Sequence, residues 1–267
     1  MNVLNKKRSS CVRSIRRTVM TLFLFYVSLT SAQMSGGLPP LKKNNEGIDP
    51  PNQSTPVPTT STARKTQQYT LQVLDQLLIF TNPVGYCSPG QSKREKDLVE
   101  GAKQFLDSGV RLIHTAARCE ELDAYREGRR DSVDHWMQIQ MIGPKGDFKR
   151  LEMSRETFLN GISKSSPQIE FNEIIKKSQS QYQKFDVNLS NASLTPIGRD
   201  GNAFYVSIQL TLGQDNAKKR VTGLGAMTLV NSVPLNILIY EATGTTNSRD
   251  QLAGLLRSSL TSLFTEN

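Results

Sequence analysis

Apolar and polar residues alternate most regularly in the C-terminal third of the chain, where the pattern predicts consecutive β-strands. In Phe204–Leu212 every second residue is apolar, which is typical of a strand with one buried face. Lys219–Val230 and Leu235–Ala242 follow after short turns, and these spacings predict an antiparallel meander. Gly223 and Gly225 lie on the same face of the second strand, which indicates that a helix packs closely over the sheet at that point.

One amphipathic helix is predicted to follow the meander. Ser248 and Gln251 form a capping box at its start, and from Arg249 onward the apolar residues recur on one stripe of a helical surface. That stripe consists of Leu252, Leu255, Leu256, Leu260, Leu263 and Phe264. A helix with such a stripe is expected to cover one face of the sheet.

The middle of the chain predicts strands separated by a helix. Leu77–Thr81 is a short apolar run and is interpreted as a buried strand. Ser92 and Glu95 form a second capping box, which opens a helix that ends at Gly109. Val110–Ala117 is the next predicted strand, and a right-handed parallel crossover is the usual connection in such a β-α-β unit.

The remaining segments have shorter patterns. Gln68–Gln76 is compatible with either a helix or a strand, and the charge-dense Glu120–Asp134 is predicted to present a solvated face. The other expected elements are a strand over Trp136–Ile142, helices over Arg155–Ile162 and Pro167–Phe185, and a polar connection over Val187–Asn202. The sequence therefore predicts an α+β fold, an antiparallel-rich sheet covered by helices that ends in a β-meander followed by an amphipathic helix.

The first 32 residues are organised like a secretory signal peptide. A basic region extends to Arg17, the apolar run Val19–Leu29 follows it, and the small residues Thr30 and Ala32 suit cleavage before Gln33. The apolar run has 11 residues, whereas about 20 are needed to span a bilayer. A signal peptide is therefore the favoured interpretation. The alternative is an uncleaved inner-membrane anchor over residues 19–32, and both interpretations export the rest of the chain.

Composition divides the chain after residue 32 into a linker and a domain. Residues 33–66 contain six prolines and few large apolar side chains, which is typical of a disordered linker. Residues 67–267 are predicted to form a single α+β domain, which the linker would hold away from a membrane or cell-wall layer.

The net charge of +9 does not belong to the predicted domain. Ten of the 33 basic residues and two of the 24 acidic residues lie in the first 66 positions, so the domain carries 23 bases and 22 acids. A nucleic-acid-binding domain would concentrate basic residues on one face. The sequence therefore argues against a nucleic-acid partner and places any membrane contact in the N-terminal segment, if that segment is uncleaved.

Two cysteines remain beyond the leader, which contains Cys11. Cys87 and Cys119 are predicted to form a disulfide, because export exposes them to an oxidising compartment. Such a bridge stabilises a fold by about 3–4 kcal/mol. A parallel crossover would bring both strand ends to the same edge, whereas antiparallel pairing is expected to separate the cysteines. A nucleophilic or metal-binding cysteine would need a nearby base or further ligands in close spacing, and the sequence offers neither.

No catalytic, cofactor-binding or metal-ligating residue is predicted. The chain contains no G-x-S-x-G elbow and no phosphate-binding P-loop. His114 lies within a strand pattern and is expected to be a hydrogen-bonded residue of the core or its rim. His135 follows Asp131 and Asp134, a cluster compatible with a metal or acid–base site, although a chance surface position is favoured.

Several segments resemble the exported PsbP/DcrB-like α/β families. They are Asn82-Pro83-Val84-Gly85-Tyr86 after an apolar strand, Leu229-Val230-Asn231 before the strand Leu235–Tyr240, and Cys119-Glu120-Glu121-Leu122. Secreted bacterial proteins of this type also have one cysteine after the first Pro-x-Gly turn and another before an acidic "E-L" pair. The resemblance covers Leu77 to Leu263. It implies a sheet covered by helices and an accessory or binding role, and it supplies no catalytic residue.

These observations favour an exported, periplasmic, non-enzymatic binding or accessory domain of the cell envelope, with an envelope protein or small ligand as partner and no cofactor. An alternative is an envelope hydrolase with Cys119 or Cys87 as nucleophile and His114 or His135 as base. A second alternative is a membrane-anchored subunit of a secretion assembly.

Overall fold

The computed structural model describes most of the chain beyond residue 66. The described residues are 67–104, 106–143, 146–165, 176, 179, 189–213, 218–242 and 248–267. The expected leader, the linker and nearly all of the helix expected over Pro167–Phe185 lie outside these residues, so they stay predictions. The side chain of Ser248 is also outside the description, although a helix does begin at this residue.

The described part of the chain has an α+β fold, as the sequence predicts. Its strands are β1 (Gln68–Val73), β2 (Gln76–Thr81), β3 (Tyr86–Cys87), β4 (Val110–Arg118), β5 (His135–Ile142), β6 (Leu189–Arg199), β7 (Phe204–Leu212), β8 (Lys219–Val230) and β9 (Val233–Glu241). Its helices are α2 (Lys93–Gln104), α3 (Cys119–Arg126), α4 (Arg155–Ser165) and α6 (Ser248–Thr265).

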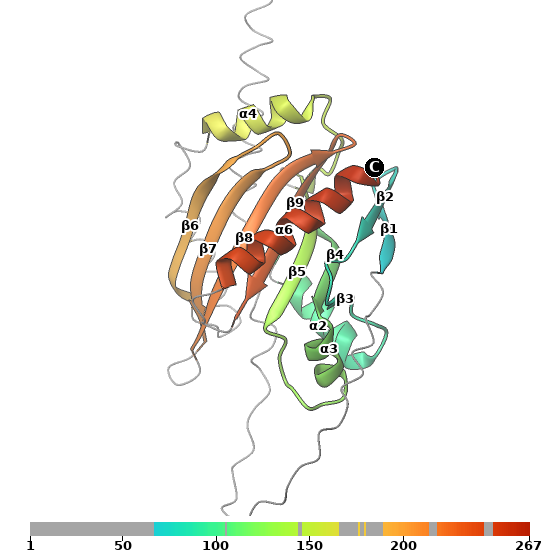
Figure 1. Cartoon of the computed structure of the whole chain (residues 1–267), viewed down its shortest axis with the longest axis vertical. Coiled ribbons are helices and arrows are strands. Elements are labelled where there is room, and N and C mark those ends of the chain that lie inside the picture. Colours follow the sequence, from blue (N-terminus) through green and yellow to red (C-terminus); the bar gives the residue numbers. More distant parts are fainter. Residues whose placement is uncertain are drawn as a thin grey trace, which may run out of the picture.

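One seven-stranded sheet, in the order β3-β4-β5-β9-β8-β7-β6, forms the centre of the molecule (Figure 1). Every pair of neighbouring strands is antiparallel. The predicted meander is confirmed as β7, β8 and β9. All nine residues of β9 are buried, because this strand lies in the middle of the sheet and is covered on both faces.

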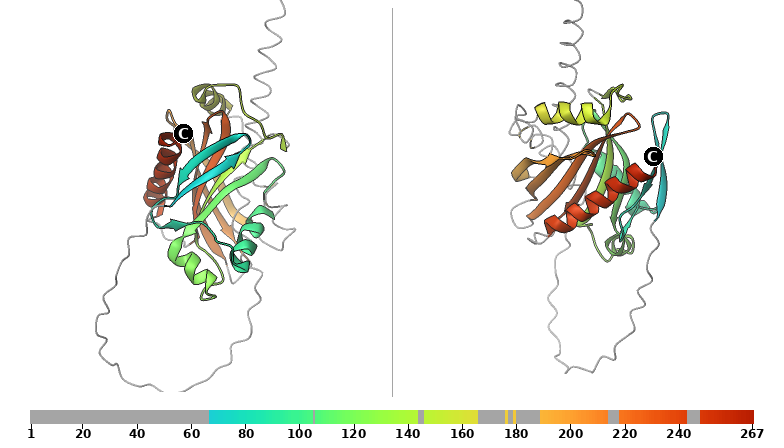
Figure 2. Two further views of the ribbon diagram at one scale, coloured as in Figure 1. Left: turned by 90° about the vertical axis from the view of Figure 1, so that its right-hand side faces the viewer. Right: turned by 45° about the horizontal axis from the view of Figure 1, so that its top comes forward.

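Each face of the sheet packs against a separate apolar core. Met137 and Ile237 point into the core under α6, whereas Trp136 and Leu238 point into the core that α2, α3 and α4 cover. Such alternation follows from the two-residue repeat of a strand. The left view of Figure 2 shows α6 and α2 on opposite sides of the sheet.

The segment that the sequence left undecided is a strand. β1 pairs with β2 in a hairpin that turns at Leu74, whose φ is 57°, and it forms a second sheet of two strands. Phe80 packs into the core under α6, whereas Leu77 is 63% exposed, so β2 is covered on one face only. Asn267 also clamps β2, because its amide nitrogen donates to the Ile79 carbonyl and its amide oxygen accepts the Ile79 N–H, both at 2.8 Å.

The predicted parallel crossover between the first apolar strand and β4 is wrong. The apolar run belongs to the hairpin, so β2 and β4 lie in different sheets. The two-residue strand β3 pairs with β4 instead, in an antiparallel register that places Cys87 opposite Ala117. The helix α2 therefore connects two antiparallel strands, β3 and β4, where the sequence predicted that it would connect two parallel ones.

The predicted polar connection over Val187–Asn202 is also wrong, because Leu189–Arg199 forms the edge strand β6. Its ladder with β7 is interrupted between Ser190 and Ser193 and again between Pro196 and Gly198. Proline and glycine are tolerated at such bulges of an edge strand, and they hide the alternation that would reveal the strand in the sequence.

The element that approaches Gly223 closely is not the helix that the sequence predicts. A Cβ atom at this position would lie 2.5 Å from the Tyr240 ring, which belongs to the register partner of Gly223 on β9. The close approach therefore comes from a side chain of the adjacent strand, where the sequence analysis expected a helix.

None of the helices in the described ranges is long and apolar enough to cross a membrane.

Candidate functional site

A groove of about 550 Å³ runs along β4, between the β1–β2 hairpin and α2. Its floor is formed by Leu112–Thr115, one wall includes Tyr69, and α2 contributes Lys96 and Val99 to the other wall. The volume lies within the range of about 300–1,000 Å³ that is usual for binding sites. This groove could not be predicted from the sequence, because its walls come from segments whose contact depends on the tertiary fold.

The groove follows an edge of β4 that no described strand covers. β3 pairs only with Ala117 and Arg118, so the outer edge of β4 is unpaired over the preceding residues. The Cys119 N–H donates to the Gly85 carbonyl at 2.8 Å, so the backbone groups of Cys119 face this edge. Because backbone groups alternate along a strand, the N–H and C=O of Thr115 face it as well.

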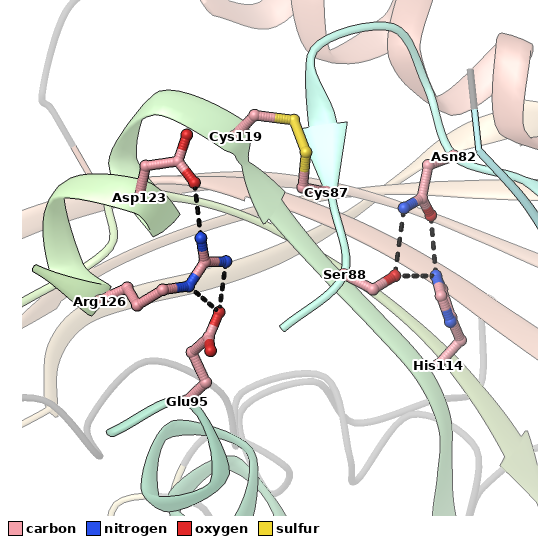
Figure 3. The surroundings of a disulfide bond; sticks show 8 residues. All are labelled: Asn82, Cys87, Ser88, Glu95, His114, Cys119, Asp123 and Arg126. Carbon is pink, nitrogen blue, oxygen red and sulfur yellow. Dashed lines mark hydrogen bonds and ion pairs between the residues drawn. A yellow bond between two sulfur atoms is a disulfide. The ribbon is translucent and has the colours of Figure 1, made fainter. Parts of the chain in front are cut away.

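His114 lies in the floor of the groove and is held by neutral partners. Its ring packs against Tyr69 and Phe80, with centroid distances of 4.7 and 5.4 Å. Its Nε2 lies 2.8 Å from Asn82 Oδ1 and 3.3 Å from Ser88 Oγ, and Asn82 Nδ2 donates to the same hydroxyl at 3.2 Å (Figure 3). Burial lowers the pKa of His114 to about 4, so the ring is neutral at pH 7.

This cluster does not have the geometry of a serine–histidine catalytic pair. An amide oxygen only accepts hydrogen bonds, so the hydrogen on Nε2 of His114 is donated to Asn82. Nε2 therefore has no free lone pair with which to take the proton of Ser88. In catalytic triads the orienting group binds the other ring nitrogen. The expectation that His114 is a hydrogen-bonded residue at the rim of the core is confirmed.

A disulfide joins Cys87 and Cys119 beside the groove, with a Cα–Cα distance of 4.9 Å. The cysteines meet because Cys87 pairs with Ala117, two residues before Cys119. The expectation that antiparallel pairing would separate them is therefore wrong. Since both sulfur atoms are bonded to each other, neither is a nucleophile in this state, and the hydrolase hypothesis loses the residue on which it depended.

A buried carboxylate fixes the helix that forms the groove wall. Glu95, on α2, accepts hydrogen bonds from Ser92 Oγ at 2.6 Å and from two nitrogens of Arg126 at 2.7 and 3.0 Å. Burial alone would raise the pKa of Glu95, but the hydrogen bonds from Arg126 and Ser92 outweigh it and lower the pKa to about 2. The predicted capping box thus also ties α2 to α3, as Figure 3 shows for the Glu95–Arg126 pair.

His135 lies in a second cluster, which is buried and charged. Its Nδ1 is 2.6 Å from Glu121 Oε1, and its Nε2 is 3.5 Å from Glu241 Oε1. Glu121 Oε2 accepts two backbone N–H bonds at the start of β5, at 2.8 and 2.9 Å. The expected surface position of His135 is wrong, and Asp131 takes no part because it pairs with Arg94 at 3.3 Å.

This second cluster fastens α3 to the sheet. Burial raises the pKa of Glu121, but hydrogen bonds from the His135 side chain and from backbone N–H groups outweigh that effect and lower the pKa to about 2. The predicted solvated face of Glu120–Asp134 is therefore wrong at Glu121, which is 6% exposed. Among the residues that the structure describes, no three metal-ligating side chains are grouped so that they would hold an ion.

A group of buried amides that was not predicted lies on the sheet face opposite α6. Gln138, Gln140 and Asn236 are fully buried, and Gln140 Nε2 donates to Gln138 Oε1 at 2.7 Å. The buried side-chain atoms on this face without a hydrogen-bond partner are Gln138 Nε2, Gln140 Oε1, both polar atoms of the Asn236 amide and Trp136 Nε1. The sequence did contain a signal for these buried amides, because a strand in the middle of a covered sheet has to bury its polar positions too.

The fold and the groove together define an α+β domain with an open antiparallel sheet, whose free edge borders a binding-sized depression. No protein-family model matches the chain, and a search of curated proteins finds no match. Among solved structures, the Saccharomyces cerevisiae Ran-binding protein Mog1p is 8% identical with a TM-score of 0.31, over 75% of this chain and 94% of that one. A structure of a Mog1 mutant gives 7% identity and a TM-score of 0.30, over the same shares of the two chains. Likeness at this level transfers neither fold nor function.

Proposed function

We propose that this protein is an exported, non-enzymatic binding or accessory domain of the cell envelope, related to the PsbP/DcrB-like families, which holds its partner in the β4 groove. The observation that carries the proposal is the groove itself, with the unpaired edge of β4 as its floor. The walls are fixed before any partner arrives, because the Cys87–Cys119 disulfide and the Glu95–Arg126 pair hold β3, α2 and α3 together.

Two features support the exported location. The first 32 residues have the regions of a signal peptide, and a disulfide such as Cys87–Cys119 persists in oxidising compartments. Residues 33–66 would then tether the domain within the envelope. The hypothesis of a membrane-anchored subunit of a secretion assembly differs in one respect, because it retains residues 19–32 in the mature protein.

A photo-crosslinking experiment in intact cells tests the binding role. The photoreactive residue p-benzoylphenylalanine replaces Leu112 in the groove floor, and the matched control replaces Leu77, which is 63% exposed on the hairpin. We expect a partner adduct from position 112 and none from position 77. Equal adducts at both positions, or none at position 112, would contradict binding in the groove.

Mass spectrometry of the same protein tests the location. We expect a chain that begins at Gln33, recovered from the envelope fraction and without a reactive thiol until it is reduced. A full-length chain in the membrane would favour the anchored subunit. A full-length cytosolic chain with free thiols would rule out export.

A further inference from the structure

The free edge of β4 presents the backbone chemistry that pairs with another strand. β3 covers this edge for two residues only, because Pro89 follows shortly after Cys87 and has no N–H with which to extend the ladder. The chain then leaves the edge and enters α2. The N–H and C=O of Thr115 consequently point into the groove without a strand partner among the described residues. Such unpaired groups are a template for an incoming strand.

The groove walls stand on opposite faces of the sheet, so the space between them is a slot at the sheet edge. The hairpin packs on the α6 face, and α2 packs on the other face. An extended peptide in this slot directs alternate side chains toward the two walls. One set of side chains meets the rings of Tyr69 and His114, and the other set meets Lys96 and Val99.

The charges of the groove favour an acidic residue next to α2. Lys103 forms an ion pair with Glu100 at 2.7 Å, whereas Lys96 has no ion pair among the described residues. A carboxylate on the occupant would supply the missing partner of Lys96. The contribution of one exposed ion pair is small, so this charge selects among peptides and the backbone ladder supplies most of the affinity.

We propose that the occupant of the groove is an extended peptide segment of a partner protein, which adds to β4 as a further strand and places an acidic side chain beside Lys96. This inference rests on the proposed binding function and names the class of partner. A compact small ligand would leave the backbone groups of β4 unused, and a second copy of this chain would have to pair the same edge in a symmetric dimer.

A peptide selection tests the proposal. A display library of random heptapeptides is selected against the exported protein with its disulfide intact, and the enriched peptides are synthesised with a fluorophore. Each peptide is also made in two N-methylated forms, with the methyl groups on odd or on even residues. Because only every second N–H of an added strand faces its neighbour, one form is expected to bind at least tenfold more weakly and the other form within about twofold of the parent.

Variants of α2 test whether the peptide binds in the groove. Val99→Arg fills the slot and is expected to weaken binding at least tenfold, and Lys96→Glu is expected to weaken acidic peptides several-fold. Lys93→Glu is the matched control, because Lys93 lies on the same helix outside the groove and its side chain is 90% exposed. Circular dichroism checks that each variant is folded, and hydrogen exchange is expected to slow at the Thr115 amide when a peptide binds.

Several results would overturn the peptide proposal. They are a library that yields no binder, binding that is indifferent to both N-methylated forms, binding that survives Val99→Arg and Lys96→Glu in folded protein, and a dimer that buries β4. If position 112 still gives an adduct with a non-peptide molecule, the proposed binding function stands and only the peptide inference fails. If peptides bind but the chain stays in the cytosol, the envelope assignment fails instead.

Discussion

His114 and His135 are equally buried, at 8% exposure each, yet they lie in opposite electrostatic surroundings. His114 contacts an amide, a hydroxyl and two aromatic rings, and it borders the groove. His135 lies between the carboxylates of Glu121 and Glu241, away from the groove. The two regions therefore share a residue type and a degree of burial but differ in charge.

The charged cluster around His135 fastens the fold, whereas the neutral cluster around His114 borders the groove. Around His135, Glu121 engages its side chain and two backbone N–H groups, which fastens α3 to β5. Around His114 the contacts are neutral, so an occupant of the groove meets no buried charge there. Substitutions in the charged region should therefore cost more stability than substitutions in the neutral region.

The largest effect is expected from Glu121→Ala. The substitution leaves His135 and two backbone N–H groups buried without their acceptor. Breaking a buried pair in this way costs about 3–5 kcal/mol of unfolding free energy. Urea denaturation measures it, with Glu120→Ala as the control, because the Glu120 side chain is 77% exposed. A loss below about 1 kcal/mol would remove the distinction between the two regions.

Removal of the disulfide should act on both regions at once. The bridge spans 32 residues and joins β3, beside the groove, to the first residue of α3, which carries Glu121. Cys87→Ser together with Cys119→Ser is expected to lower the unfolding free energy by about 3–4 kcal/mol. Hydrogen exchange should then rise in both β3 and α3. A rise confined to one of them would show that the regions are held independently.

Acid should weaken the two regions in different pH ranges. The pKa of His114 is about 4 in the fold and 6.5 in a free side chain, so the unfolded chain binds the extra proton. Stability is therefore expected to fall by about 3 kcal/mol as the pH falls from 6.5 to 4. The contribution of Glu121, whose pKa is lowered from 4.5 to about 2, is present above pH 4.5 and is lost as the pH falls toward 2.

Denaturation at a series of pH values separates these two ranges. His114→Phe should flatten the curve between pH 6.5 and 4, and Glu121→Gln should change it mainly below pH 4.5. If His114→Phe leaves the upper range unchanged, the neutral burial of His114 is refuted.

The smallest effects are expected among the neutral partners of His114. Asn82→Ala removes the acceptor of the ring N–H and should cost about 1–2 kcal/mol. Ser88→Ala keeps that acceptor and should change stability by less than about 0.5 kcal/mol. Thermal unfolding of the two variants compares them directly. A larger loss for Ser88→Ala would mean that the hydroxyl is the main partner of the ring.

The sequence predicted the strands that form long, regular runs of apolar residues, whether one face is buried, as in β7, or both faces are buried, as in most of β8. Phe204–Leu212 and Lys219–Val230 have the bounds that the pattern predicts for β7 and β8. β1 stayed undecided because its turn, at Leu74 and Asp75, contains neither glycine nor proline. β6 was missed because Pro196 and the bulges of an edge strand obscure its alternation.

Little of the candidate site could be predicted, because its contacts join distant parts of the chain. Local spacing paired His135 with Asp131 and Asp134, but its partners are Glu121 on α3 and Glu241 at the end of β9. The cysteine pair was correct, yet the topology expected to produce it was wrong. The groove depends on where β3 stops, and a two-residue strand leaves no periodic signal.

The clamp between Asn267 and β2 has a consequence for how the molecule matures. Ile79 exchanges two hydrogen bonds with a residue 188 positions later, so the hairpin that opens the domain lacks its outer partner until α6 has been made. Contacts so far apart in the sequence slow folding. The outer side of β2 is therefore expected to close only after α6 has formed, and a variant without Asn267 should expose this strand to proteases.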